Sequence, residues 1–221
     1  MVQRAEKTEP APDANTDQEA VRTAPEPAGN TEPAGNSGQL DSTEDAFHNL
    51  EVFSNSAYNI TKKEKLNDVV VNLAQKVLQS QFPDMKGFHD SVMGPRTFPV
   101  ESGTFVQILH FKDHWIVVGG LENGQVDVYD SSSSGVLSSG FVNQINLLRG
   151  GLDAVTNLKS CQQQVNGYDC GVYAIANAYG ICAGLSVRDL KYNRGKMREH
   201  LIACLRRRES SPFPLYPTLH S

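Results

Sequence analysis

The chain has 221 residues, of which 39% are hydrophobic and 20% are charged, and its formal net charge is −5 at pH 7. This length predicts about one to one and a half domains. The sequence excludes a membrane-spanning helix, because no apolar run approaches about 18 residues, and its first residues lack the apolar segment of a secretory signal. The four cysteines match no zinc-ligand spacing and are too few for a disulfide scaffold. We therefore expect an intracellular protein, in the nucleus or cytoplasm, with no cofactor, no metal and no membrane partner.

Charge is distributed unevenly along the chain. Residues 1–48 hold 10 acidic residues, 3 basic residues and five of the 11 prolines, whereas the remainder holds 15 acidic and 17 basic residues. A segment of the first kind cannot bury enough apolar surface to offset the entropy lost on ordering. We expect a disordered acidic, proline-rich arm over residues 1–50, a folded domain over 51–208 and a tail over 209–221. The near-neutral folded part gives no drive towards nucleic acid, and we expect a monomer.

The first half of the folded part predicts one helix and three strands. Apolar residues from Val69 to Leu78 recur at helical spacing, Asn67 or Asp68 can cap the helix, and Pro83 ends it. After an irregular stretch, three runs rich in β-branched and aromatic residues predict strands over Thr104–His110, Trp115–Val118 and Gln125–Tyr129. The pair Asn123-Gly124 indicates a hairpin turn between the last two strands.

The second half predicts helices separated by polar loops. A loop over residues 131–140 precedes a helix over Phe141–Leu148, which Gly150-Gly151 ends. Residues 161–168 are polar and rich in turn formers. The segment from Cys170 to Cys182 is apolar on all sides, which is typical of a buried helix. A last helix over about Lys196–Arg208 has Met197, Leu201 and Leu205 on one face.

Cys170 lies at the start of the apolar helix, where a nucleophile can be built. Asp169 is a suitable N-cap, and the unpaired N–H groups and positive dipole end of the first turn favour a thiolate. Gly171 has no side chain that could shield the sulfur. The alternative is that Cys170 is one more small buried hydrophobic residue, as most free cysteines are.

A nucleophile needs a base and a group that orients the base. His114 begins the second strand run and Asp130 follows the third, so antiparallel pairing brings them towards each other. A two-residue turn would place Asp130 opposite Val117, whereas a five-residue loop would place it opposite His114. The sequence does not choose between these registers.

The combined pattern resembles a known family. His114-Trp115, Asp130-Ser131 and the segment from Gln164 to Gly171 are similar to motifs of the ubiquitin-like-protein-specific cysteine proteases, the SUMO-protease family related to adenovirus protease. Gln164 stands six residues before Cys170, as in that family, and Leu66-Asn67-Asp68 matches the start of its first helix. The resemblance covers about residues 64–205. It implies an α+β, papain-like cysteine peptidase fold of the Ulp/adenovirus-protease type, with a central, mostly antiparallel sheet flanked by helices.

The resemblance also implies a role for each residue of the site. Cys170 is the nucleophile, His114 is the base and then the acid, and Asp130 orients the imidazole. The side-chain amide of Gln164 and the backbone N–H of Cys170 form the oxyanion hole. Gln163 could replace Gln164 if the turn shifts by one residue.

Substrate recognition is where the chain departs from the family. Trp115 matches one wall of the tunnel in which the family binds a C-terminal Gly-Gly, but Lys65 replaces the Trp of the other wall. The sequence predicts a thiol protease acting on peptide or isopeptide bonds of a ubiquitin-like protein of SUMO or neddylation type, with that protein or its conjugates as partner. One alternative, which Lys65 favours, is a viral or mobile-element-type protease that processes a polyprotein. Another is a non-catalytic module that binds ubiquitin-like proteins.

Overall fold

The computed structural model describes residues 57–92, 98–151 and 153–217. The arm expected over residues 1–50 lies outside the described residues. A helical turn over residues 57–61 comes first. The labelled elements then follow in chain order: α2 (Asp68–Gln81), β1 (Lys86–Gly87), β2 (Phe105–Phe111), β3 (His114–Gly120), β4 (Val126–Tyr129), α3 (Ser139–Leu148), β5 (Thr156–Lys159), α4 (Cys170–Cys182), the 3-10 helix η1 (Val187–Asp189) and α5 (Arg194–Arg207).

The strands form one sheet in the order β1-β2-β3-β4-β5. The central strands β2, β3 and β4 pair antiparallel, whereas β1 pairs parallel to β2 and β5 pairs parallel to β4. The α+β fold with flanking helices is confirmed, and the expected antiparallel sheet is its centre. The sheet as a whole is mixed, because β5 returns to β4 through the crossover helix α3, which makes this pair parallel.

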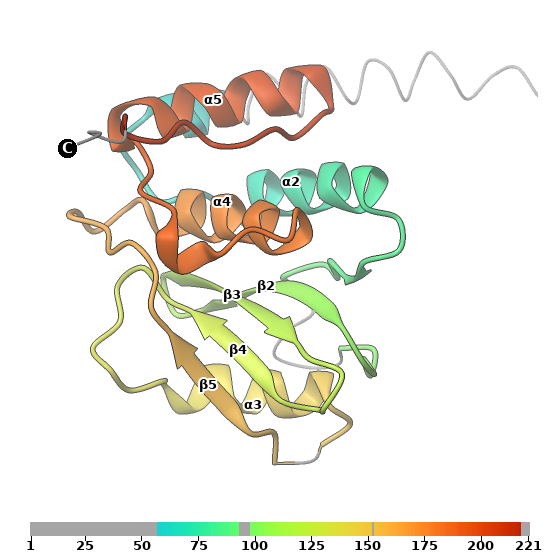
Figure 1. The fold of residues 1–221 in the computed structure, drawn as a ribbon. Helices are drawn as coiled ribbons and strands as arrows, with labels where there is room; N and C mark the ends of the chain where they lie inside the picture. The colour runs from blue at the N-terminus through green and yellow to red at the C-terminus, as the bar shows by residue number, and fades with distance from the viewer. Residues whose placement is uncertain (1–56, 93–97, 152, 218–221) are drawn as a thin grey trace, which may run out of the picture. The chain divides into compact units, whose positions relative to one another are not determined.

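Helices cover both faces of the sheet. Figure 1 shows α4 and α2 above the sheet with α5 on top of them, and α3 below it. The side-chain alternation of the strands explains the two cores. Val106 and Ile108 of β2 and Val117 of β3 face the core formed with α2, α4 and α5. Residues one position away, such as Leu109 and Ile116, face the core formed with α3.

The helix that leads into the site forms as predicted. Asn67 caps α2, because its Oδ1 accepts a hydrogen bond of 3.0 Å from the backbone N–H of Val70. The helix α4 has the predicted bounds and is buried over its length from Cys170 to Gly180. An apolar helix of this kind fits between α5 and the sheet because every side of it meets another element.

The segment after α5 packs back onto the domain. Phe213 is 3% exposed and belongs to the upper core, and Leu215 forms an antiparallel bridge with Tyr192. The backbone N–H of Asn193 donates to the carbonyl of Pro214 at 2.7 Å. The segment after α5 is therefore anchored on the domain, and Phe213 contributes to the core around α4 and α5.

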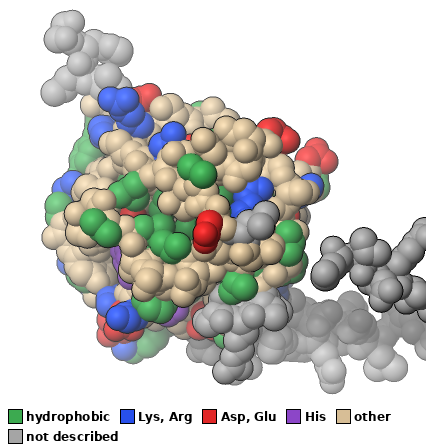
Figure 2. Space-filling model, turned by 90° about the horizontal axis from the view of Figure 1, so that it is seen from below, with side chains coloured by type: hydrophobic (Ala, Val, Ile, Leu, Met, Phe, Trp, Pro, Cys, Tyr) green, Lys and Arg blue, Asp and Glu red, His purple; other side chains and the backbone are tan. Residues whose placement is uncertain are grey.

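The surface seen from the α3 side carries exposed apolar side chains as single residues and small groups among polar atoms (Figure 2). Charged side chains of both signs lie mostly towards the edge of this view. Scattered apolar residues of this kind need no partner to explain them. Among the described residues, none of the helices has both the length and the apolar character needed to cross a membrane.

Candidate active site

His114 and Asp130 come together through the register of β3 and β4. Val117 pairs with Tyr129, and the connection between the strands is the five-residue stretch 121–125, so neither predicted register occurs. Continuing this register brings Asp130 beside Ile116, which shares a sheet face with His114 because the two are two residues apart. The Nε2 atom of His114 lies 2.7 Å from Oδ1 of Asp130.

The environment of His114 favours its protonated form. Burial on its own would lower the pKa of this imidazole. The hydrogen bonds and negative charges of Asp130 and Cys170 outweigh burial and raise the pKa of His114 from 6.5 to about 9. The imidazole therefore carries a positive charge at neutral pH.

Cys170 lies close enough to this imidazole to contribute to the raised pKa of His114. Because Nε2 of His114 is bonded to Asp130, Nδ1 is the ring nitrogen left to face a thiol. Cys170 is also the first residue of α4. The imidazolium and the positive end of the helix dipole both stabilise a negative charge on sulfur.

The two neighbours of Cys170 act differently from what the sequence suggested. Asp169 occupies the N-cap position, but its side chain makes no capping hydrogen bond. Its carboxylate instead accepts bonds from Nε of Arg198 at 2.8 Å and Nδ2 of Asn166 at 2.7 Å. The bond from the charged guanidinium is the stronger of the two. A Cβ on Gly171 would lie 3.1 Å from Leu66, so this glycine allows close packing of α4 rather than access to the sulfur.

Gln164 is held by contacts on both ends of its side-chain amide. The hydroxyl of Ser131 donates to Oε1 at 2.8 Å, and Nε2 donates to the carbonyl of Asn166 at 2.6 Å. Since an amide nitrogen carries two hydrogens, a second one remains for a substrate oxygen. The alternative residue, Gln163, donates to the carbonyl of Asp130 at 2.9 Å and accepts from the N–H of Ser133. Gln163 therefore stabilises the loop after β4 through these two hydrogen bonds.

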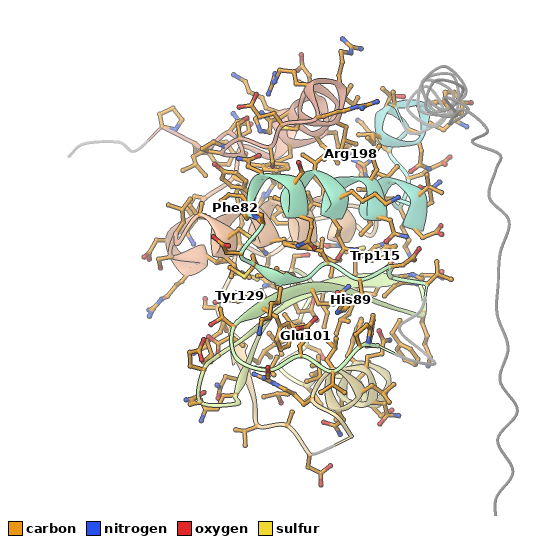
Figure 3. The ribbon with its side chains drawn as sticks, turned by 90° about the vertical axis from the view of Figure 1, so that its right-hand side faces the viewer. Phe82, His89, Glu101, Trp115, Tyr129 and Arg198 are labelled. Atoms are coloured by element: carbon orange, nitrogen blue, oxygen red, sulfur yellow. The ribbon has the colours of Figure 1, made fainter. Side chains whose placement is uncertain are left out.

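Arg198 of α5 is a structural residue of the site that the sequence analysis missed. Besides Asp169, its guanidinium donates at 2.7–3.1 Å to the carbonyls of Ile60, Lys62, Glu64 and Tyr168. Figure 3 shows Arg198 between α5 and the segment that leads into α2. It joins two loops that flank Cys170, residues 60–64 and 166–169. No local pattern in α5 distinguishes this arginine, since its partners lie 29 or more residues away in the chain.

Trp115 lies at the level of the sheet beneath α2 (Figure 3) and is 2% exposed. Its Nε1 donates to the carbonyl of Leu66 at 3.0 Å, and its ring centroid lies 4.2 Å from that of His110. Trp115, His110 and Leu66 border a cavity of about 330 Å³ together with Asp68. Lys65, which replaces the expected Trp, has its Nζ 3.9 Å from a carboxylate oxygen of Asp113.

Two further thiols, Cys161 and Cys182, are kept protonated by their surroundings. Burial raises the pKa of Cys161 to about 11 and that of Cys182 to about 12. The thiol of Cys161 donates to the carbonyl of Asp130 at 3.4 Å. Within the part of the chain that the structure describes, no three His, Cys, Asp or Glu side chains are grouped to hold a metal ion.

Comparison with known proteins finds similarity in structure alone. No family model and no curated protein sequence matches the chain. The C-terminal Ulp1 protease domain in complex with Smt3, the yeast orthologue of SUMO, is 16% identical with a TM-score of 0.57, over 74% of this chain and 94% of that chain. A de-sumoylating protease is 14% identical with a TM-score of 0.51, over 70% of this chain and 85% of that chain. The chain thus has the fold of the Ulp1-type cysteine protease domain, as its motifs predict.

Proposed function

We propose that this chain is a cysteine peptidase that cleaves the peptide or isopeptide bond after the C-terminus of a ubiquitin-like protein. The observation that carries the proposal is that His114 of β3 interacts with Asp130 after β4 and with Cys170 of α4. Gln164 adds support, because its side chain bonds to Ser131, the residue after Asp130. A cluster with a purely structural role would not require a half-buried, positively charged imidazole beside a thiol.

In the proposed reaction, the thiolate of Cys170 attacks the scissile carbonyl carbon while its proton resides on His114. The developing oxyanion accepts hydrogen bonds from the side-chain amide of Gln164 and the backbone N–H of Cys170. His114 then gives its proton to the leaving amine, and a thioester forms on Cys170. Water, deprotonated by His114, hydrolyses the thioester and restores the thiol.

The structure of Ulp1 bound to Smt3 supports a ubiquitin-like protein as the substrate class. A second candidate keeps the same chemistry and cleaves other peptide sequences, as a polyprotein-processing protease would. Lys65 favours it, because a charged residue stands where the resemblance predicts an apolar tunnel wall. The third possibility, a non-catalytic binding module, is disfavoured by the 2.7 Å contact between His114 and Asp130.

The test is a panel of ubiquitin, SUMO and the neddylation modifier, each carrying a C-terminal electrophile. We expect one of them to form a covalent adduct with the wild-type protein and none to react with Cys170→Ala, as measured by intact mass. A protein whose Cys170 reacts with iodoacetamide but with no member of the panel would refute the substrate class. Cleavage of a peptide library without selection for glycine before the scissile bond would then support the second candidate.

A further inference from the structure

A second cavity borders the proposed catalytic pair on the α3 side of the sheet. It has a volume of about 230 Å³, and His114 and Asp130 form part of its wall. The rest of the wall consists of the apolar side chains of Phe111, Phe141 and Val136, of Lys112, and of serines from the loop over 132–138. The volume is sufficient for one large side chain.

The apolar part of this cavity depends on a specific backbone arrangement. The rings of Phe111 and Phe141 pack edge to face with centroids 5.9 Å apart, and the ring of Phe141 lies 6.0 Å from that of His114. A Cβ at Gly140 would overlap the ring of Phe111, so glycine at the start of α3 is what lets this ring lie there. The cavity wall is therefore continuous with the imidazole.

The chemistry of peptide cleavage indicates which part of the substrate lies nearest to this cavity. The group that protonates the leaving amine must reach its nitrogen, so the leaving part of the substrate lies next to His114. Among the described residues, neither Cys170 nor Trp115 lines this cavity, whereas Trp115 borders the separate cavity beneath α2. Of these two cavities, only the one on the α3 side is bordered by the imidazole of His114.

Besides the imidazole of His114, a lysine lines this cavity. Lys112 is exposed, and its Nζ lies 5.4 Å from the centroid of the Phe111 ring. Its neighbour Asp113 is directed to Lys65, and Asp130 is engaged by His114. The charge of Lys112 is therefore available to a substrate.

We propose that this cavity binds the side chain of the residue that follows the scissile bond, with a preference for a large apolar residue, and that Lys112 selects an acidic residue at the next position. This proposal rests on the proposed function, because it takes His114 as the acid. It extends that function to the leaving group, which the acyl side of the site does not select.

The experiment uses ubiquitin, SUMO and neddylation-modifier precursors extended after Gly-Gly by a short peptide in which only the first two residues vary. We expect Leu or Phe at the first position to be cleaved about ten-fold faster in kcat/KM than Gly, because the side chain leaves water for an apolar cavity. Glu at the second position should be favoured over Lys by about three-fold, as for an exposed ion pair.

Variants then identify the residues responsible, each compared as a ratio between two substrates so that changes in folding cancel. Lys112→Glu should reverse the Glu-over-Lys preference, whereas the matched charge reversal Lys76→Glu on α2 should leave it unchanged. Val136→Ser should reduce the preference for Leu over Gly. If the electrophile panel labels Cys170 but the rates differ by less than two-fold across first residues, the cavity proposal is overturned and the proposed function stands. If no panel member labels Cys170, both are overturned.

Discussion

Replacing Arg198 by alanine tests whether one side chain holds the two loops beside Cys170. The guanidinium makes one ion pair and four hydrogen bonds to backbone carbonyls. The bonds to Asp169, Ile60 and Tyr168 are partly buried, whereas the other two carbonyls are exposed and can bond to water. Truncation therefore removes the guanidinium donor from two partly buried carbonyls and the charged partner from the Asp169 carboxylate, which keeps only its bond from Asn166.

The magnitude follows from these three acceptors. Each partly buried acceptor left unpaired costs about 1–3 kcal/mol, and breaking a buried ion pair on one side costs about 3–5 kcal/mol in total. Because both members of the Arg198–Asp169 pair retain 15% exposure, we expect a loss near the lower end of that range, about 3 kcal/mol. With a urea m-value of about 2 kcal/mol/M, the unfolding midpoint should fall by about 1.5 M.

Urea unfolding can be followed by the fluorescence of Trp115, the only tryptophan in the chain, which is buried. Arg198→Lys should lose less than Arg198→Ala, because lysine keeps the charge but cannot bond to acceptors on several sides at once. The control is Arg188→Ala, an exposed arginine in η1, which should change stability by less than about 0.5 kcal/mol. An Arg198→Ala protein within about 1 kcal/mol of wild type would show that water replaces the guanidinium, and the reasoning would fail.

Three further measurements address the sheet, the helix cap and the imidazole. Folding raises the pKa of His114 from 6.5 to about 9, so the stabilisation from its protonated form is complete below pH 6.5 and is lost as the pH rises through 9. The urea midpoint of the wild-type protein should therefore fall over this pH range. The midpoint of His114→Gln should fall less over the same range, and an equal fall in both proteins would contradict the role of His114. Gly120→Ala should cost about 1–3 kcal/mol because its methyl would overlap the buried ring of Phe105. Gly119→Ala next to it meets only ordinary contacts from 3.7 Å and should cost clearly less, and equal thermal midpoints for the two variants would contradict the packing argument. Asn67→Ala should lower stability by about 0.5–2 kcal/mol through the lost cap of α2, whereas an unchanged midpoint would mean that water caps the helix equally well.

The sequence was most informative where local pattern and tertiary packing agree. The helix over Cys170–Cys182 is apolar on all sides and is buried as that pattern requires. The strand over Thr156–Lys159 was not predicted, because Thr-Asn-Leu-Lys has a low intrinsic strand propensity. Its parallel pairing with β4 stabilises the extended conformation instead. The hairpin register was missed because the chain pairs only up to Gly120 and from Val126, so the Asn-Gly pair lies within a longer loop.

The motifs proposed His114, Asp130, Gln164 and Cys170 as the site through their order and spacing. The structure brings His114 to Asp130, whereas the residues that support the site could not be inferred from the sequence. The role of Arg198 could not be predicted, because a residue that bonds to backbone carbonyls distant in the chain is not marked by any local sequence pattern. Asp169 forms an ion pair with Arg198 instead of capping α4, and this pairing could not be inferred from its N-cap position alone.

The two halves of the candidate site belong to different cores. His114 contacts Phe141 in the core below the sheet, whereas Cys170 is part of the core above it. The alignment of His114 and Cys170 is therefore a joint property of both layers, transmitted through strands β2 and β3, which contribute side chains to each. A change deep in either layer that shifts one core against the other would separate His114 from Cys170 while leaving every residue of the candidate site intact.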